Sequence, residues 1–519
     1  MAAVSCLMTV YKTLLTPHVS GQLSRHLIYR SMGKFLLPPL RKIYKGNIFQ
    51  KQPTLITRSM LIKRDRLPDT QDIVRWKVDI LRSTTPRPTS PTRTQFLRKI
   101  MRKTHSIIIS IMLASLAMPA LSADQPLSLP DRLAAVRTTI AIDHGKMVGS
   151  GAATLIDAGL QSQFVLIGED HGIAEIANFS AAYFEALASQ GFTTLIVENG
   201  PAVADALEKK LKSNTGVAGI AAFNTTYPVA TAFYKWQDEA QFLARIAKAA
   251  GPSFQLVGMD QELMGASKYL LEKMAGQALS PLAKSKIEAF RKLESDAYRR
   301  ASENGDPREL FMMKIKEEEL VALQNLLTAP GDMPALAMLN SLIDSRSIYS
   351  KNMTPGQGYA SNTQRARLMK QLVASHLTLA PAQRTLLKAG AIHVFRGYNP
   401  LGAGSREVGN YLAEYAEGRG QKSLHVLVLA SKGKQAQFAG IGRPSATTEI
   451  EKIDARSAMA GVLPFFAAAS EHKEWSLFDV RPLLASATTL ANGNSSVQGM
   501  IQGYDFVLVI PNGNATSDL

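Results

Sequence analysis

Residues 164–200, FVLIGEDHGIAEIANFSAAYFEALASQGFTTLIVENG, constrain the fold more than any other part of the chain. An apolar run at 164–167 is followed by apolar residues spaced three or four apart over 173–187, and then by a second apolar run at 195–197. These patterns are typical of a strand, a helix and a second strand. The two strands of such a unit are parallel, so their carboxyl ends lie at the same edge of a sheet.

Four further apolar runs predict additional strands, at 254–259, 385–391, 424–430 and 504–510. A short helical stretch is expected at 131–142. We therefore predict an α/β fold with a mainly parallel central sheet flanked by helices.

A long helical stretch interrupts the predicted strands between 261 and about 380. Its pattern is amphipathic and rich in charge, and no strand signal occurs in it. We expect a helical insertion or cap over the edge of the sheet; ordinary crossover helices with long loops are the alternative. On this interpretation, residues 124–519 form a single α/β hydrolase-like domain.

The positive charge of the chain is confined to its N-terminal part. Residues 1–123 contain 21 Lys and Arg but 4 Asp and Glu, which accounts for the whole formal charge of +17. Residues 124–519 are formally neutral, so the charge gives no support for nucleic-acid binding by the globular part. Residues 1–100 are predicted to be a basic, non-globular extension. An early start assignment explains it, and an organelle presequence is the alternative.

Residues 101–123 have the three parts of a secretory signal peptide. Met101-Arg102-Lys103 precedes an apolar run at 107–121, and small residues precede the polar start of the mature chain. The run is shorter than the roughly 20 residues of a membrane-spanning helix. We therefore expect cleavage between Ala120 and Asp124, export to the periplasm or the extracellular space, and no stable membrane span afterwards.

Ionisable residues stand at the ends of four predicted strands. Glu169 and His171 follow the first, Glu198 the second, Asp260 the third and His393 the fourth. Because parallel strands end at one edge, we expect these side chains to converge there. A histidine with a pKa near neutrality can take a proton from water while a carboxylate orients its ring.

The pattern favours hydrolysis by an activated water. The chain has no Gly-x-Ser-x-Gly elbow between a strand and a helix, and no His-Glu-x-x-His zinc motif. Two histidines and a carboxylate can nevertheless ligate a divalent metal. The ligands would then be His171, His393, Glu169 and Glu198.

Three arginines and one aspartate are candidates for substrate binding. Arg365 and Arg367 lie on a predicted helix, and Arg396 follows the motif that contains His393. Either Arg365 or Arg396 could stabilise an oxyanion. Asp260 is the fourth candidate, although a strand-end aspartate also commonly caps a helix.

At these residues the chain resembles the superfamily that joins the erythromycin esterases with the Tiki/TraB and ChaN-like proteins. Members carry Gly-Glu-x-His or Gly-x-x-His after the first strand, a Glu after the second, and a histidine after a later strand. The matching residues are Gly168-Glu169-Asp170-His171, Glu198 and Gly390-Ala391-Ile392-His393. The resemblance implies a hydrolase-like fold with Glu169, His171, Glu198 and His393 in the catalytic cleft, and Arg365 as a substrate contact.

The chain also departs from the erythromycin esterase pattern. Those enzymes usually have one more residue between the Glu and His of the first motif, and His-Asn where this chain has Gly390 and Ala391. Ala366 stands where an Asp often follows the first arginine. These differences count against macrolide lactone hydrolysis.

Three functions follow from the motifs. The leading hypothesis is an exported hydrolase that cleaves an ester, lactone or amide in a small molecule or peptide. The second is a metal-dependent peptidase of Tiki type. The third is an extracytoplasmic haem or iron binder like ChaN, which is the one hypothesis that requires haem.

Overall fold

The computed structural model describes residues 127–519 except 214, 399–404 and 458. The predicted N-terminal extension and signal peptide, residues 1–123, lie outside the described residues. No helix in the described part of the chain is long and apolar enough to cross a membrane.

A nine-stranded sheet forms the centre of the fold, in the order β2-β1-β10-β11-β7-β3-β6-β4-β5. Six neighbouring strands, from β11 to β5, are mutually parallel. This arrangement confirms the prediction of a mainly parallel α/β sheet. The six strands are β3 (Phe164–Glu169), β4 (Phe192–Val197), β5 (Gln255–Gly258), β6 (Arg384–Gly390), β7 (Ser423–Ala430) and β11 (Phe506–Ile510).

Three antiparallel strands extend the sheet beyond β11: β1 (Arg137–Asp143), β2 (Lys146–Val148) and β10 (Trp475–Asp479). The prediction of a helix over 131–142 is therefore only half correct. The helix α4 (Leu129–Val136) ends where β-branched residues begin, and β1 then pairs with β10. A separate hairpin joins β8 (Lys434–Gln437) and β9 (Ala446–Glu449).

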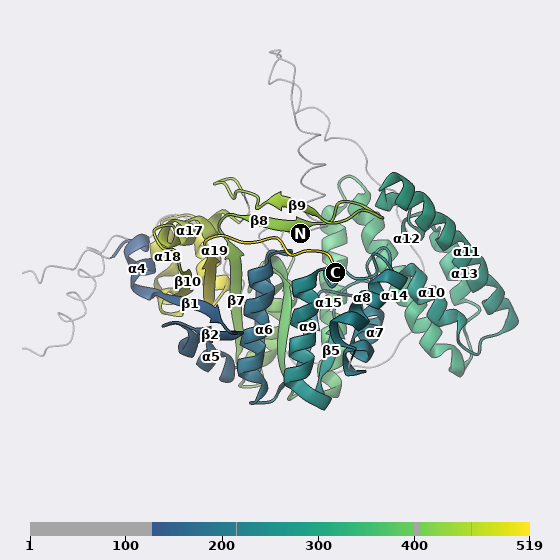
Figure 1. Cartoon of the computed structure of the whole chain (residues 1–519), viewed down its shortest axis with the longest axis horizontal. Helices are drawn as coiled ribbons and strands as arrows, with labels where there is room; N and C mark the ends of the chain where they lie inside the picture. The colour runs from purple at the N-terminus through teal and green to yellow at the C-terminus, as the bar shows by residue number, and fades with distance from the viewer. Residues whose placement is uncertain (1–126, 214, 399–404, 458) are drawn as a thin grey trace, which may run out of the picture. The chain divides into compact units, whose positions relative to one another are not determined.

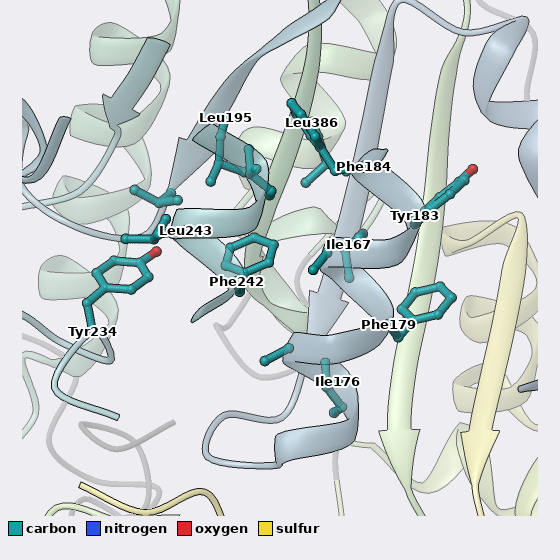
Figure 2. Close-up of a cluster of buried hydrophobic side chains, with 14 of the residues drawn as sticks. Ile167, Ile176, Phe179, Tyr183, Phe184, Leu195, Tyr234, Phe242, Leu243 and Leu386 are labelled. Carbon is teal, nitrogen blue, oxygen red and sulfur yellow. The ribbon is translucent and has the colours of Figure 1, made fainter. Parts of the chain in front are cut away.

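Helices cover both faces of the sheet. Figure 1 shows α6 (Ala174–Ala188) and α9 (Gln237–Ala250) in front of it. Apolar residues of both helices pack against strand residues such as Ile167, Leu195 and Leu386 (Figure 2). On the other face, a second apolar cluster contains residues of α15 (Gly358–Leu379), α16 (Val408–Glu417), α17 (Leu463–Ala469) and α19 (Ser495–Gly503).

The chain between β5 and β6 is helical, which confirms the predicted insertion. Its helices pack around an apolar core of their own. In Figure 1 most of them lie beside α7 (Pro201–Lys212) and α8 (Gly216–Thr226), and α15 returns the chain to the sheet. The others are α10 (Ser267–Ala275), α11 (Pro281–Asn304), α12 (Phe311–Lys314), α13 (Glu317–Gln324) and α14 (Met333–Met353).

Candidate active site

Glu169 and His171 lie at the carboxyl end of β3. Glu169 is the last residue of the strand, and its Oε1 is 2.9 Å from Nδ1 of His171. Because a carboxylate only accepts hydrogen bonds, Nδ1 carries a proton. In the neutral ring the lone pair is then on Nε2. The next residue, Gly172, has a φ of 82°, and a Cβ there would lie 2.2 Å from the backbone oxygen of Ala436. The turn that places His171 therefore requires a glycine.

Neighbouring segments hold this turn in place. The backbone oxygen of Gly172 accepts hydrogen bonds from the backbone N–H groups of Ala436, at 2.9 Å, and Thr516, at 3.1 Å. The ring of Phe233 stacks on His171 with 3.9 Å between ring centroids. Ala436 of β8 and Thr516 of the C-terminal segment thus hold the turn that carries His171, and Phe233 packs against its ring.

Glu198 follows β4 and lies between both predicted catalytic histidines. Its Oε2 is 3.5 Å from Nε2 of His171, and its Oε1 is 3.6 Å from Nε2 of His393. These distances are too long for strong hydrogen bonds. Its close contacts are the backbone N–H of Gly390 and Nη2 of Arg365, each at 2.7 Å.

His393 is in the short helix that follows β6 (Ala391–Val394). Its Nδ1 is 3.0 Å from Oε2 of Glu407, and the Ser405 hydroxyl donates to Oε1 of the same carboxylate at 2.8 Å. Both histidines therefore have Nδ1 against a buried glutamate and Nε2 towards Glu198. The sequence analysis did not identify Glu407.

Arg365 links the ends of two strands. It donates to Glu198, and its Nε donates to Oδ1 of Asp260 at 3.0 Å while Nη2 contacts Oδ2. Arg365 lies in the first half of α15, the helix that returns the chain from the insertion to the sheet. Asp260, two residues beyond β5, holds the guanidinium in place.

The structure brings together most of the predicted site residues, but not all. Arg396 donates to Asp505 at 2.9 Å, and it makes none of the contacts that join Arg365 to the carboxylates. Arg367 is exposed on α15. The residues brought together are Glu169, His171, Glu198, Asp260, Arg365 and His393.

A buried lysine was missed by the sequence analysis. Nζ of Lys388, on β6, lies 2.6 Å from Oε1 of Glu169 and 2.9 and 3.0 Å from the oxygens of Glu239. All three side chains are at most 4% exposed. A charged residue within the apolar run TLLKAG is the sequence signal for Lys388, whereas Glu239 lies in the first turn of α9 and has no such signal.

Pairing between opposite charges shifts the pKa values of the acids and bases in the site. Burial alone would raise the pKa of Glu198, but His393, His171 and Arg365 hold that pKa well below 4.5. Burial also raises the pKa of Glu169, and Lys388 and His171 more than offset it, so the pKa is lowered. For His171, burial lowers the pKa, but the carboxylates of Glu169 and Glu198 raise it above 6.5. Both acids are therefore ionised at neutral pH.

The side chains do not fit a metal site. Glu198, which Nε2 of each histidine faces, already accepts hydrogen bonds from Arg365 and Gly390, so each of its oxygens is paired with an N–H donor. Among the residues that the structure describes, no group of three His, Cys, Asp or Glu is arranged to hold a metal ion. The metallopeptidase alternative therefore gains no support from these residues.

Comparison with known proteins relates the chain to others through its fold. No family model and no curated protein matches the sequence. Among solved structures, a mutant of the erythromycin esterase EreC in its open conformation has a TM-score of 0.51 at 15% identity, over 73% of this chain and 97% of that chain. A Bacillus cereus protein has a TM-score of 0.50 at 14% identity, over 75% and 98% of the two chains.

The haem-binding protein ChaN of Campylobacter jejuni has a TM-score of 0.27 at 14% identity, over 61% of this chain and 98% of that chain, which is too low to support the haem alternative. At these identities the similarity concerns the fold alone. The chain has the fold shared by erythromycin esterase, which confirms at this level the resemblance drawn from its motifs.

Proposed function

We propose that the protein is a hydrolase in which His171 activates a water molecule. One observation carries this proposal: among the described residues, Nε2 of His171 is a buried ring nitrogen without a hydrogen-bond partner. Buried polar atoms are normally paired, and unpaired ones are typical of sites that bind a ligand or a water. Since Glu169 holds the proton on Nδ1, the free Nε2 has the lone pair that a general base needs.

The reaction can be written with each proton accounted for. Nε2 of His171 takes a proton from water, and the resulting hydroxide adds to a carbonyl carbon. Nε and Nη2 of Arg365 are held by carboxylates, and Nη1 would donate to the oxyanion. When the tetrahedral intermediate collapses, Nε2 returns the proton to the leaving oxygen or nitrogen. His393 faces the same Glu198 and would orient the water from the other side.

The substrate class follows from this chemistry. An activated water cleaves an ester, a lactone or an amide, in a small molecule or a peptide. The name of one structural neighbour, an erythromycin esterase, favours an ester bond. Gly390 and Ala391 stand where the esterases carry His-Asn, so a macrolide is not the proposed substrate. The signal-like residues 101–123 support export to the periplasm or the extracellular space.

Hydrolysis of p-nitrophenyl acetate tests the proposal. We expect His171→Ala to lower kcat/KM by a factor of about 100 or more, since a positioned general base contributes 10²–10⁴-fold. The thermal midpoint should change little. His144→Asn is the matched control, because His144 is in the exposed turn between β1 and β2 at a φ of 46°, which Asn tolerates. Full activity in a His171→Ala/His393→Ala double variant would disprove the proposal.

A further inference from the structure

Lys388 has an unusual place for a lysine. It lies in the interior of the sheet, on β6, where its neighbours in register are Ile167 on β3 and Val197 on β4. Its ammonium group contacts three carboxylate oxygens, one from Glu169 and two from Glu239. An ammonium has three N–H donors, so these contacts use all of them.

Burying the charges of Lys388 and its partners costs solvation free energy, and core packing alone does not explain why a lysine is present. Burying charges costs several kcal/mol of solvation, and well-packed apolar residues of similar volume are often as stable or more stable. The surroundings are apolar enough for such a replacement: the ring of Phe242 lies 5.1 Å from Nζ. A role in the fold therefore does not require a lysine here.

Glu169 links this lysine to the histidine. Its Oε1 accepts from both Nζ of Lys388 and Nδ1 of His171, while Oε2 has no partner among the described residues. One oxygen thus shares its charge between an ammonium and an imidazole. Without the ammonium, His171 would be the adjacent group able to balance the Glu169 carboxylate, and it would do so by taking a proton on Nε2.

We propose that Lys388 is a positioning residue that acts as the counterion of Glu169 and so opposes protonation of His171 at Nε2, with Glu239 holding the ammonium in place. This inference rests on the proposed role of His171 as a base. It extends the machinery of the site to two residues that do not touch the reacting atoms.

Several charged groups bear on the protonation of His171. Glu169 faces it from β3, and Glu198 faces it from the end of β4. Asp170 is its neighbour in the turn, and Glu239 acts on it from α9 across Lys388. Phe233, which stacks on the ring, is uncharged. On the Nε2 side, Arg365 of α15 already pairs with Glu198, whereas Lys388 is the cation that pairs with Glu169 on the Nδ1 side, so its removal leaves Glu169 without an ammonium.

The test is a substrate-free titration. The ring nitrogens of His171 are followed by ¹⁵N NMR between pH 5 and 9 (roughly the range where imidazoles titrate) in the wild type and in the Lys388→Met/Glu239→Leu variant. The double variant removes one positive and one negative charge, so no uncompensated Glu239 is left buried. We expect the titration midpoint of His171 to rise by about one pH unit or more, because the Lys388 ammonium is a like charge that disfavours the imidazolium and the variant lacks it.

Two variants serve as controls. Arg245→Met/Glu185→Leu removes an ion pair of the same charges between α9 and α6 and should leave the midpoint unchanged. Lys388→Arg retains the positive charge and should move the midpoint less than the double variant does. If the Met/Leu pair does not fold, Lys388→Gln/Glu239→Gln replaces it, with the same expectation.

The outcomes separate this inference from the proposed function. A midpoint within about 0.3 unit of the wild type in the folded double variant would overturn the inference. A raised midpoint supports it, and the pH at which p-nitrophenyl acetate hydrolysis is half-maximal should then rise in parallel. A raised midpoint in a protein whose wild type hydrolyses no ester, lactone or amide would support the control of His171 by Lys388 and reject the hydrolase.

Discussion

Arg365 donates a hydrogen bond to Glu198 over 2.7 Å, although 167 residues separate the two in the chain. The contact joins α15, at the end of the helical insertion, to the residue that follows β4. The insertion is therefore connected to the candidate active site by a buried charge pair.

Removing that charge pair should destabilise the protein. Arg365→Met would leave Glu198 and Asp260 buried without their counterion, which costs about 3–5 kcal/mol of unfolding free energy. Arg365→Lys should cost less, because it keeps the positive charge. It should still lower the stability, because an ammonium cannot bridge both carboxylates as the planar guanidinium does. Urea denaturation measures both. Arg367→Met, two residues along on the exposed side of α15, is the control and should stay within about 0.5 kcal/mol of the wild type. Equal stability of the Arg365→Met and Arg367→Met variants would contradict the role of the pair.

Gly390→Ala should impair activity with little effect on stability. A Cβ at this position would lie 3.2 Å from Nε2 of His171 and 3.4 Å from Oε2 of Glu198, so it would enter the space where the proposed water is activated. The backbone of Gly390, with a φ of −53° and a ψ of 143°, is one that alanine adopts without strain. We expect a decrease in kcat of about tenfold or more, since displaced catalytic groups lose that much. An unchanged kcat would place the reacting water elsewhere.

Activity should depend on pH through His171. Its pKa lies above 6.5, and only the neutral ring is a base, so kcat/KM should fall as the pH drops through that raised value. Glu198→Gln removes a negative charge that raises this pKa, and the half-maximal pH should then decrease. By linkage, the contribution of His171 to stability is fully present below 6.5 and is lost as the pH rises through the folded pKa. A pH-independent kcat/KM between 5 and 9 (roughly the imidazole range) would be incompatible with this assignment.

Glu262 should make the stability of the protein sensitive to pH. Its Oε1 accepts from the backbone N–H of Ala202 at 2.7 Å, in the first turn of α7, and burial raises its pKa to about 7. Between 4.5 and about 7 the folded state therefore binds more protons than the unfolded state, so unfolding free energy falls as the pH rises. Glu262→Gln can still accept from Ala202 and has no charge to bury. It should be more stable at pH 8 by at most about 3 kcal/mol, as thermal unfolding at pH 5 and pH 8 would show.

The prediction is contradicted if the difference in stability between Glu262→Gln and the wild type is the same at both pH values. The Glu262 carboxyl group would then titrate alike in the folded and the unfolded state. Ala202→Gly is unsuitable as a control because it alters the helix itself. Glu208→Gln, whose side chain is partly exposed on the same helix and accepts from the backbone N–H of Leu256, is the matched change. The two variants are compared by thermal unfolding at the same two pH values.

Apolar periodicity predicted all six parallel strands, because five of them are compact runs of mostly buried residues and β5, though partly exposed, lies in the apolar run at 254–259. It failed for β1, β2 and β10, which are short or partly exposed and lie outside the parallel core. β1 was misread as part of a helix because a true helix, α4, precedes it without an interruption.

The pattern of apolar runs was enough to predict that Glu169, His171, Glu198, Asp260 and His393 lie at or just beyond strand ends, and parallel strands bring those ends to one edge for reasons of chain geometry. Which of these groups are in contact depends on the order of the strands and the packing of the helices. The order of the strands places β6 between β3 and β4, so Lys388 reaches Glu169 and Gly390 reaches Glu198. Partners such as Glu239, in the first turn of α9, and Glu407, just before α16, lie in segments whose local sequence does not record what they face, because contacts between distant segments depend on how the elements pack.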